Sequence, residues 1–217
     1  MMVDDSTRTR LLEAAGAEFA ELGYAQATVR GILKRAGMSN VAAIHYYFGD
    51  KEKLYTEAVL DAHRHGGPEI EGGDESGGPA KRRLRGFIHE FLTKALSRDG
   101  ANTWRDRLMM REMMEPTIAT DALVRVVIRH RFGRLRAILK ELAPCVDDKR
   151  LSALCFSVVG QCLFYRVGRP FAERLIGADQ FAGLDLEYLS DHITNVVLAA
   201  VRAANARHEE GPCPGSR

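Results

Sequence analysis

Two consecutive segments decide the fold: Thr28-Val-Arg-Gly-Ile-Leu-Lys-Arg-Ala-Gly37 and Met38-Ser-Asn-Val-Ala-Ala-Ile-His-Tyr-Tyr-Phe48. The first segment opens on Thr28, a favourable helix N-cap, and closes on Gly37, the residue type that most often follows a helix. The apolar residues between them recur at helical spacing. We therefore expect a short helix that ends in a tight turn at Gly37.

The second segment predicts another short helix directly after this turn. Ser39 or Asn40 can cap it, and it covers Val41 to Tyr47 before stopping near Gly49. Two short helices joined by a glycine-containing turn are typical of a helix-turn-helix DNA reader.

Helical periodicity continues on both sides of this pair. After it, Asp50 caps a helix from Lys51 to about Arg64. Before it, a helix capped by Ser6 or Thr7 runs to Gly23, with its apolar face formed by Leu11, Leu12, Ala15, Phe19 and Leu22. Short helices cannot each bury a core alone, so we expect them to pack as a small bundle.

The rest of the chain is also helical by its periodicity. Six of the 13 residues from 66 to 78 are glycine, which predicts a linker. Beyond it the pattern predicts helices at about 81–97, 103–114, 120–142, 148–167 and 186–207. No segment has a convincing strand pattern, and we predict an all-α fold.

Composition narrows the class further. Hydrophobic residues make up 46% of the chain and charged residues 28%, enough to close a core. No apolar run approaches 18 residues and the first five residues lack an apolar stretch, so we expect neither an ordinary transmembrane helix nor a secretory signal. The four cysteines form no Cys-x-x-Cys pair, and we expect reduced thiols and a cytoplasmic protein.

Charge is distributed unevenly. The net charge is +2, but between residues 28 and 53 five basic residues stand against two acidic ones, a local excess of +3. Such a patch suits an anionic partner, although a solvated helix face gives the same count.

An enzyme, and a helical adaptor that never touches DNA, are the competing hypotheses. The sequence has no Gly-rich phosphate loop, no Gly-x-Ser-x-Gly elbow and no His-Glu-x-x-His helix, so we expect no catalysis, metal or cofactor. His63 and His65 with Glu69 and Glu71 have the chemistry of metal ligands, but they border the Gly-rich stretch and fit a solvated loop.

The two short helices carry residue types that groove reading needs. Ile32, Leu33 and Ile44 would form their small core, and Ala36 with Gly37 would let the helices cross closely. Ala42 and Ala43 would keep the second helix slim enough for the major groove. His45, Tyr46 and Tyr47 would place hydrogen-bonding groups at the end of this helix, and Lys51 would meet a phosphate.

This part of the sequence resembles the TetR family of transcriptional repressors. The matching motifs are Phe19-Ala-Glu-Leu-Gly-Tyr24, Thr28, Ala36-Gly37 and Tyr46-Tyr-Phe-Gly-Asp-Lys-Glu-x-Leu54, in this order. The resemblance implies DNA backbone contacts from Thr28, Arg30, Tyr47 and Lys51, and base reading by Asn40, Val41, Ala42, His45 and Tyr46. One departure is that Gly37 to Phe48 is one residue longer than the family spacing, which places the extra residue near Met38 and Ser39.

The family resemblance implies a C-terminal half that dimerises, and the residues indicate this independently. The stretch from Leu151 to Tyr165 is apolar almost all round, and the last helix carries a broad apolar face. Two such helices from each subunit would make a two-fold symmetric four-helix interface, the alternative being a single buried core helix. The predicted interface residues are Leu151, Leu154, Val158, Leu189, Ile193, Val196, Val197 and Ala200.

The segment from Trp104 to Thr117 holds four of the seven methionines and resembles the C-terminal domain of the CecR-like subgroup. Methionine fills irregular cavities, although ordinary core methionines give the same pattern. Arg111 and Glu112 would be costly to bury unpaired, so we expect them to pair or to face a polar cavity. For a small, mostly apolar effector we predict a pocket lined by Met109, Met110, Met113, Phe156, Gln161, Phe164 and Tyr165.

Together these features predict a ligand-responsive repressor that binds a palindromic operator as a homodimer. The predicted domains are a helix-turn-helix domain with its connecting helix over residues 1–65, a linker over 66–78, an effector-binding and dimerisation domain over 79–210, and a disordered tail over 211–217.

Overall fold

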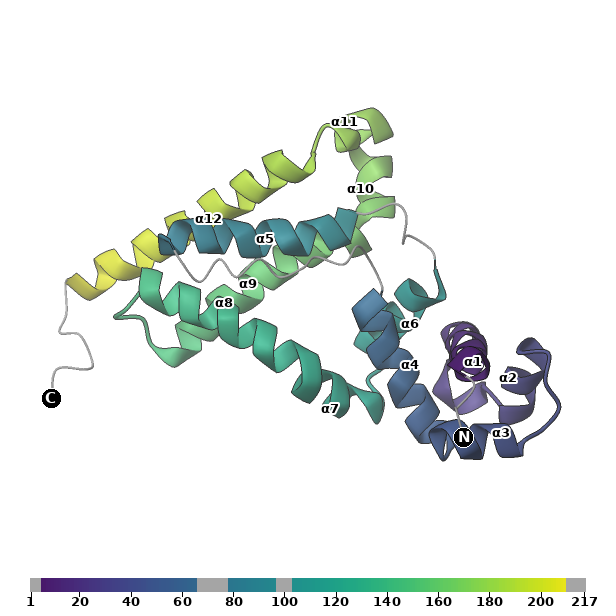
Figure 1. Ribbon diagram of the computed structural model, residues 1–217. Helices are drawn as coiled ribbons and strands as arrows, with labels where there is room; N and C mark the ends of the chain where they lie inside the picture. Colours follow the sequence, from purple (N-terminus) through teal and green to yellow (C-terminus); the bar gives the residue numbers. More distant parts are fainter. Residues whose placement is uncertain (1–4, 66–77, 97–102, 210–217) are drawn as a thin grey trace, which may run out of the picture. The chain divides into compact units, whose positions relative to one another are not determined.

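The computed structural model describes residues 5–65, 78–96 and 103–209, with side chains up to residue 206. All regular elements in these ranges are helices, as the sequence predicts (Figure 1). The predicted linker, apart from Gly78, and the predicted tail lie outside the described residues. Contacts divide the chain into two compact units. Unit 1 holds residues 1–69 and 98–128, and unit 2 holds residues 70–97 and 129–217.

Unit 1 contains the predicted helix-turn-helix, formed by α2 and α3, and five further elements. Its helices are α1 (Asp5–Gln26), α2 (Val29–Arg35), α3 (Ala42–Phe48), α4 (Lys51–His65), α6 (Trp104–Met114) and α7 (Ala119–Leu123), followed by the π-helical turn η1 (Val124–Ile128). The α1 backbone leaves helical geometry at Gly23, where φ is 78°. This is the position at which the sequence predicts that the helix ends.

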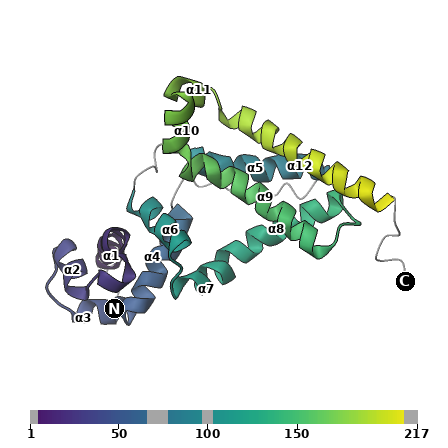
Figure 2. The same ribbon diagram turned by 180° about the vertical axis from the view of Figure 1, so that it is seen from behind.

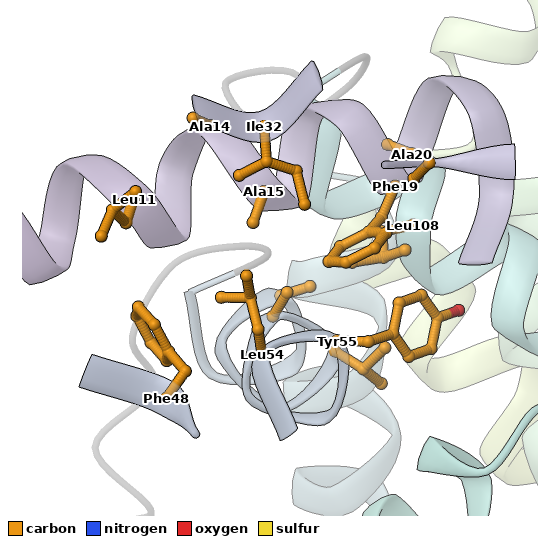
Figure 3. Packing of buried hydrophobic residues seen from close by; sticks show 14 of the residues in the cluster. Leu11, Ala14, Ala15, Phe19, Ala20, Ile32, Phe48, Leu54, Tyr55 and Leu108 are labelled. Atoms are coloured by element: carbon orange, nitrogen blue, oxygen red, sulfur yellow. The ribbon is translucent and has the colours of Figure 1, made fainter. Parts of the chain in front are cut away.

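Unit 1 is built around α1, α4 and α6, which pack on one another. Phe19 of α1 and Tyr55 of α4 meet edge to face at 4.8 Å between ring centroids, and Leu108 of α6 is fully buried beside them (Figure 3). The helix-turn-helix therefore shares its core with α6, which the sequence analysis assigned to the second domain. The compact units thus divide the chain differently from the predicted boundary near residue 79.

Unit 2 is a helical layer around α5 (Ala80–Leu96). This helix packs against α8 (Arg129–Leu142), α9 (Asp148–Val167) and α12 (Leu186–Glu209), and Figure 2 shows α5, α9 and α12 side by side. Arg85 of α5 pairs with Glu187 and Asp191 of α12, at 2.6 Å from each. Two short helices, α10 (Arg169–Ile176) and α11 (Ala178–Ala182), connect α9 to α12.

Two parts of the predicted helix map differ from the structure. The helix predicted over 120–142 is present as a continuous helical run over residues 119–142, but its geometry changes from α (α7) to π (η1) and back to α (α8). The π-helical turn carries neither proline nor glycine, but the run Val124-Arg-Val-Val-Ile128 is rich in β-branched residues, which crowd an α-helix. The helices α10 and α11 were not predicted; Pro170 lies in the first turn of α10 and Gly177 separates the two.

Glycine at position 16 allows α1 and α6 to approach closely. A Cβ added at Gly16 would lie 2.1 Å from the ring of Trp104, whose indole nitrogen is held by Glu13 at 2.6 Å. We expect Gly16→Ala to lower the free energy of unfolding by about 1–3 kcal/mol, because the ring must move. Gly133→Ala, where nothing lies within 4 Å, should be neutral or stabilise α8 by up to about 1 kcal/mol. Urea denaturation of both variants measures this, and equal effects would contradict it.

No single helix among the described residues is long and apolar enough to cross a membrane. The pair α9 and α10 passes on length and composition only, with a bend of 71° between them. Cys155 and Cys162 of α9 are buried free thiols, and burial raises the pKa of Cys162 to about 12. Cys145 is half-buried and also free, while Cys213 lies outside the described residues.

Candidate nucleic-acid interface

The turn between α2 and α3 is built by local hydrogen bonds. The Thr28 hydroxyl accepts from the Gly31 amide at 3.0 Å and so caps α2, as predicted. Gly37 adopts φ +67°, and the next amide, of Met38, returns to the Leu33 carbonyl at 2.8 Å. No atom lies within 4 Å of a Cβ at Gly37, so this glycine serves the left-handed backbone and not the close helix crossing that the sequence analysis assigned to it.

The small core beneath the two helices is confirmed. Ile32, Leu33 and Ile44 are all at most 2% exposed. Phe48 joins them at the end of α3, and the Arg8 guanidinium of α1 lies 5.0 Å from the centre of its ring. This packing fixes which face of α3 points away from the protein.

The start of α3 is set by Asn40, one of the two predicted caps. Its side-chain oxygen accepts from the Ala42 amide at 3.0 Å, and the helix begins at Ala42, one residue later than predicted. Val41 occupies the N-cap position and is 44% exposed. Ser39 is exposed in the turn, where the additional residue was expected.

The outward face of α3 brings together most of the predicted base-reading residues. Val41, Ala42, His45 and Tyr46 are exposed, with Tyr46 at 60%, and they recur at the spacing of one helical face. Tyr47 is half-buried and meets Tyr46 edge to face at 4.9 Å. The His45 ring nitrogen Nδ1 lies 2.6 Å from the Gly49 carbonyl oxygen.

The residues predicted to contact the DNA backbone lie at the start of α2 and α4, the helices before and after α3, and at the end of α3 itself. Arg30 is exposed on α2. Lys51 is the first residue of α4, and its ammonium group lies 4.6 Å from the centre of the Tyr24 ring. Burial raises the pKa of Tyr24, and the nearby Glu52 and Asp50 carboxylates add to the effect. Asp50 accepts from the Lys53 amide at 2.7 Å and caps α4, as predicted.

An ion-pair cluster that the sequence analysis missed holds α2 against α1. Arg35 bonds Glu18 at 3.0 Å and Glu21 at 2.6 Å. Glu18 is 8% exposed, and a Cβ on Gly31 would come within 2.2 Å of its carboxylate oxygen. Arg35, one of the five basic residues of the predicted patch, is therefore paired with two carboxylates and ties α2 to α1.

A second missed cluster surrounds Glu112 at the end of α6. This carboxylate is 2% exposed and accepts from the Tyr55 hydroxyl at 2.7 Å and the Thr120 hydroxyl at 2.5 Å. The Thr117 amide and hydroxyl complete the set. Burial is the main cause that raises the pKa of Tyr55, and the hydrogen bond and charge of the Glu112 carboxylate raise it further. Arg111 pairs with Glu115 at 3.7 Å and not with Glu112. The polar partners that the sequence predicts for Glu112 are therefore three hydroxyl groups and a backbone amide.

The predicted effector residues fall into both units. Met109, Met110 and Met113 lie on α6 of unit 1, and Met113 is 49% exposed. The other four lie on α9 of unit 2: Phe156, Gln161, Phe164 and Tyr165. Gln161 donates to the Ser157 carbonyl of its own helix at 3.1 Å. The methionines and the α9 residues therefore do not form one cluster within either unit.

Most of the predicted dimer residues lie in the core of unit 2. Six are at most 9% exposed and pack within this unit: Leu151, Leu154, Val158, Leu189, Ile193 and Val197. Only Val196, 43% exposed, and the half-buried Ala200 keep accessible surface. The same helices expose other large apolar side chains, namely Phe156, Phe164 and Val167 on α9 and Tyr188 on α12.

Models of two known protein families match this chain. Residues 11–58 match the model of bacterial regulatory proteins of the TetR family, and residues 80–202 match the C-terminal domain of the HTH-type transcriptional dual regulator CecR. The chain belongs to the TetR family, with a CecR-type C-terminal domain. Its relatives are transcriptional regulators and not enzymes.

Individual relatives show the same relationship. The dual regulator CecR of Shigella flexneri is 28% identical over 176 residues, which is 76% of this chain and 78% of the relative. The repressor AcnR of Corynebacterium efficiens is 48% identical over 50 residues, 23% of this chain and 26% of the relative. The crystal structure of HlyIIR, a hemolysin II transcriptional regulator, has a TM-score of 0.54 at 21% identity and covers 88% of this chain and 97% of its own. That likeness concerns the fold.

Proposed function

We propose that this regulator is a cytoplasmic repressor that binds a pseudo-palindromic operator as a homodimer and is released by a small, mostly apolar effector. The observation that carries the DNA-binding proposal is the exposed face of α3, formed by Val41, Ala42, His45 and Tyr46. The other face of α3 is fixed in the core by the buried Ile44 and Phe48. Each subunit would place this face in a major groove, with half-sites about 34–36 Å apart or wider.

The chemistry of this face suits base reading. Val41 and Ala42 offer methyl groups for contact with thymine, and His45 and Tyr46 offer hydrogen-bonding tips. Arg30, Lys51 and Tyr47 would hold the phosphates on either side, together with the Thr28 end of α2. The hydroxyl of Thr28 already caps α2, so its proposed contribution is through the end of the helix.

Phosphate and base contacts are separable by substitution. Lys51→Ala should weaken binding to all DNA sequences alike and lower the slope of log K against log salt by about 1, because one phosphate contact is lost. Tyr47→Ala should likewise weaken binding to all sequences. Tyr46→Ala should change which sequences bind. Fluorescence anisotropy on operator and random duplexes measures this, with Lys149→Ala in unit 2 as the exposed control. A sequence-dependent loss for Lys51→Ala would contradict the assigned role.

The proposed dimer uses the outward faces of α9 and α12. We propose that the exposed apolar side chains Phe156, Phe164 and Val167 of α9 and Tyr188 and Val196 of α12 are covered by the partner, because large apolar areas rarely remain exposed to solvent. A two-fold axis beside these helices would pair them with their copies in the partner and bury these side chains.

The proposed effector acts by shifting a population of dimers. An effector that favours a dimer with its α3 helices spaced wrongly for successive grooves must lower DNA affinity, and DNA must lower effector affinity by the same factor. A typical coupling is about 5- to 150-fold. A thermal-shift screen of hydrophobic compounds, followed by operator titration with each stabilising compound, tests this. Stabilisation without loss of operator affinity would contradict it.

A further inference from the structure

One hydrogen bond indicates which ring nitrogen of His45, on the exposed face of α3, carries a proton. The His45 nitrogen Nδ1 lies 2.6 Å from the Gly49 carbonyl oxygen. A carbonyl oxygen can only accept, so the ring proton of this contact is on Nδ1. In the neutral imidazole the second nitrogen, Nε2, then carries the lone pair and acts as an acceptor.

This geometry is held from the backbone side as well. The Gly49 amide donates to the His45 carbonyl at 3.0 Å, so the two residues are joined by a pair of hydrogen bonds. Gly49 has φ +87° and ψ −59°, a backbone conformation that favours glycine. The turn that ends α3 therefore also turns its carbonyl oxygen back toward the ring.

His45 occupies the middle of the exposed face. It follows Val41 by four positions and Ala42 by three, so it lies beside both on the helix surface. Both neighbours are exposed, and Ala42 is small. The imidazole is thus exposed on the same face as these two side chains.

The major groove offers such an acceptor two partners. Base edges there present donors only at the exocyclic amino groups, N6 of adenine and N4 of cytosine, whereas guanine and thymine present acceptors. We infer that His45 is a specificity-determining residue whose Nε2 accepts a hydrogen bond from the amino group of an adenine or a cytosine. This inference rests on the proposed placement of α3 in the major groove.

The first step of the test finds the base that His45 contacts. Binding sites are selected from random duplexes at pH 8 with the wild-type full chain and with His45→Ala. Because His45 is exposed, this variant should keep its fold. We expect one position in each half-site to lose its preference in the variant. The base of that pair with a major-groove amino group, adenine or cytosine, is the target of the second step. If the wild type enriches no sequence, the proposed function fails before this inference is reached.

The second step removes only the amino group. In the selected duplex the adenine is replaced by the unsubstituted base purine, or the cytosine by 2-pyrimidinone. Each analogue lacks the exocyclic amino group of the base that it replaces. Wild-type affinity should fall about fivefold or more, the size expected for one hydrogen bond, whereas His45→Ala should bind both duplexes equally. Tyr46→Ala should bind more weakly overall but keep the loss caused by the analogue.

Two results would overturn the inference while leaving sequence-specific binding intact. One is an unchanged wild-type affinity after the amino group of this base pair is removed. The other is an equal loss in wild type and His45→Ala, because the amino group would then be read by a different residue.

Discussion

Val196→Glu should convert the protein from dimer to monomer without unfolding it, whereas Val197→Glu should unfold unit 2. The two valines are neighbours on α12, but Val196 is 43% exposed and Val197 is 2% exposed within the core. A charge at Val196 stays hydrated in the monomer and becomes buried only in the proposed dimer. A charge at Val197 is buried without a partner in every folded state, which costs several kcal/mol.

Light scattering and circular dichroism separate these outcomes. We expect a helical monomer for Val196→Glu and a loss of helix, or a large fall in melting temperature, for Val197→Glu. Phe164→Glu, on the exposed face of α9, should behave like Val196→Glu. A folded dimer for both exposed-face variants would place the interface elsewhere on the protein.

Glu112→Ala should lower the free energy of unfolding by about 2–4 kcal/mol, because it leaves several hydroxyl and amide donors without an acceptor. The Tyr55 hydroxyl would lose most, since Tyr55 is 1% exposed and bonds Glu112 at 2.7 Å. Glu112→Gln should fall between this variant and wild type, because one carboxylate oxygen is replaced by a donor. Glu115→Ala, three residues on, should change stability by less than about 0.5 kcal/mol because its side chain is 73% exposed.

Urea denaturation followed by tyrosine or tryptophan fluorescence measures these differences. Trp104 lies in α6, the helix that carries Glu112, and so reports directly on unit 1. Equal stabilities of Glu112→Ala and Glu115→Ala would contradict the role given to the buried carboxylate.

The helix-turn-helix could be predicted from sequence because its signals are local. Thr28, Asn40 and Asp50 each accept from an amide two or three residues later, so the capping pattern is visible in the chain itself. Gly37 and Gly49 mark the turns by their positive φ. The one misassigned role, that of Gly37, arose because a small residue can serve either packing or backbone conformation.

The second half was less predictable because its signals depend on packing. Periodicity shows that α9 is apolar on nearly every side, but not which side faces its own unit. Leu151 and Val158 therefore look the same in the sequence as Phe156 and Phe164, although the first two are core and the last two exposed. The π-helical turn η1 has no proline or glycine to mark it.

Side-chain clusters between distant helices were also beyond sequence reasoning. The Glu18–Arg35 pair and the Tyr55–Glu112 bond join residues 17 and 57 positions apart, and no spacing rule relates them. The contact of His45 with Gly49 is a helical i, i+4 relation, but the ring nitrogen involved depends on the reversed backbone at Gly49.

The most direct test of the account is the affinity of the protein for the upstream region of its own gene, measured by gel shift with wild type and the double variant His45→Ala, Tyr46→Ala. Both substituted residues are exposed, so the fold should be unchanged. The account predicts a wild-type complex of one dimer per site that survives excess random DNA, and a double variant that binds this region no better than random DNA. Equal binding of this region by wild type and double variant would show that α3 does not read it.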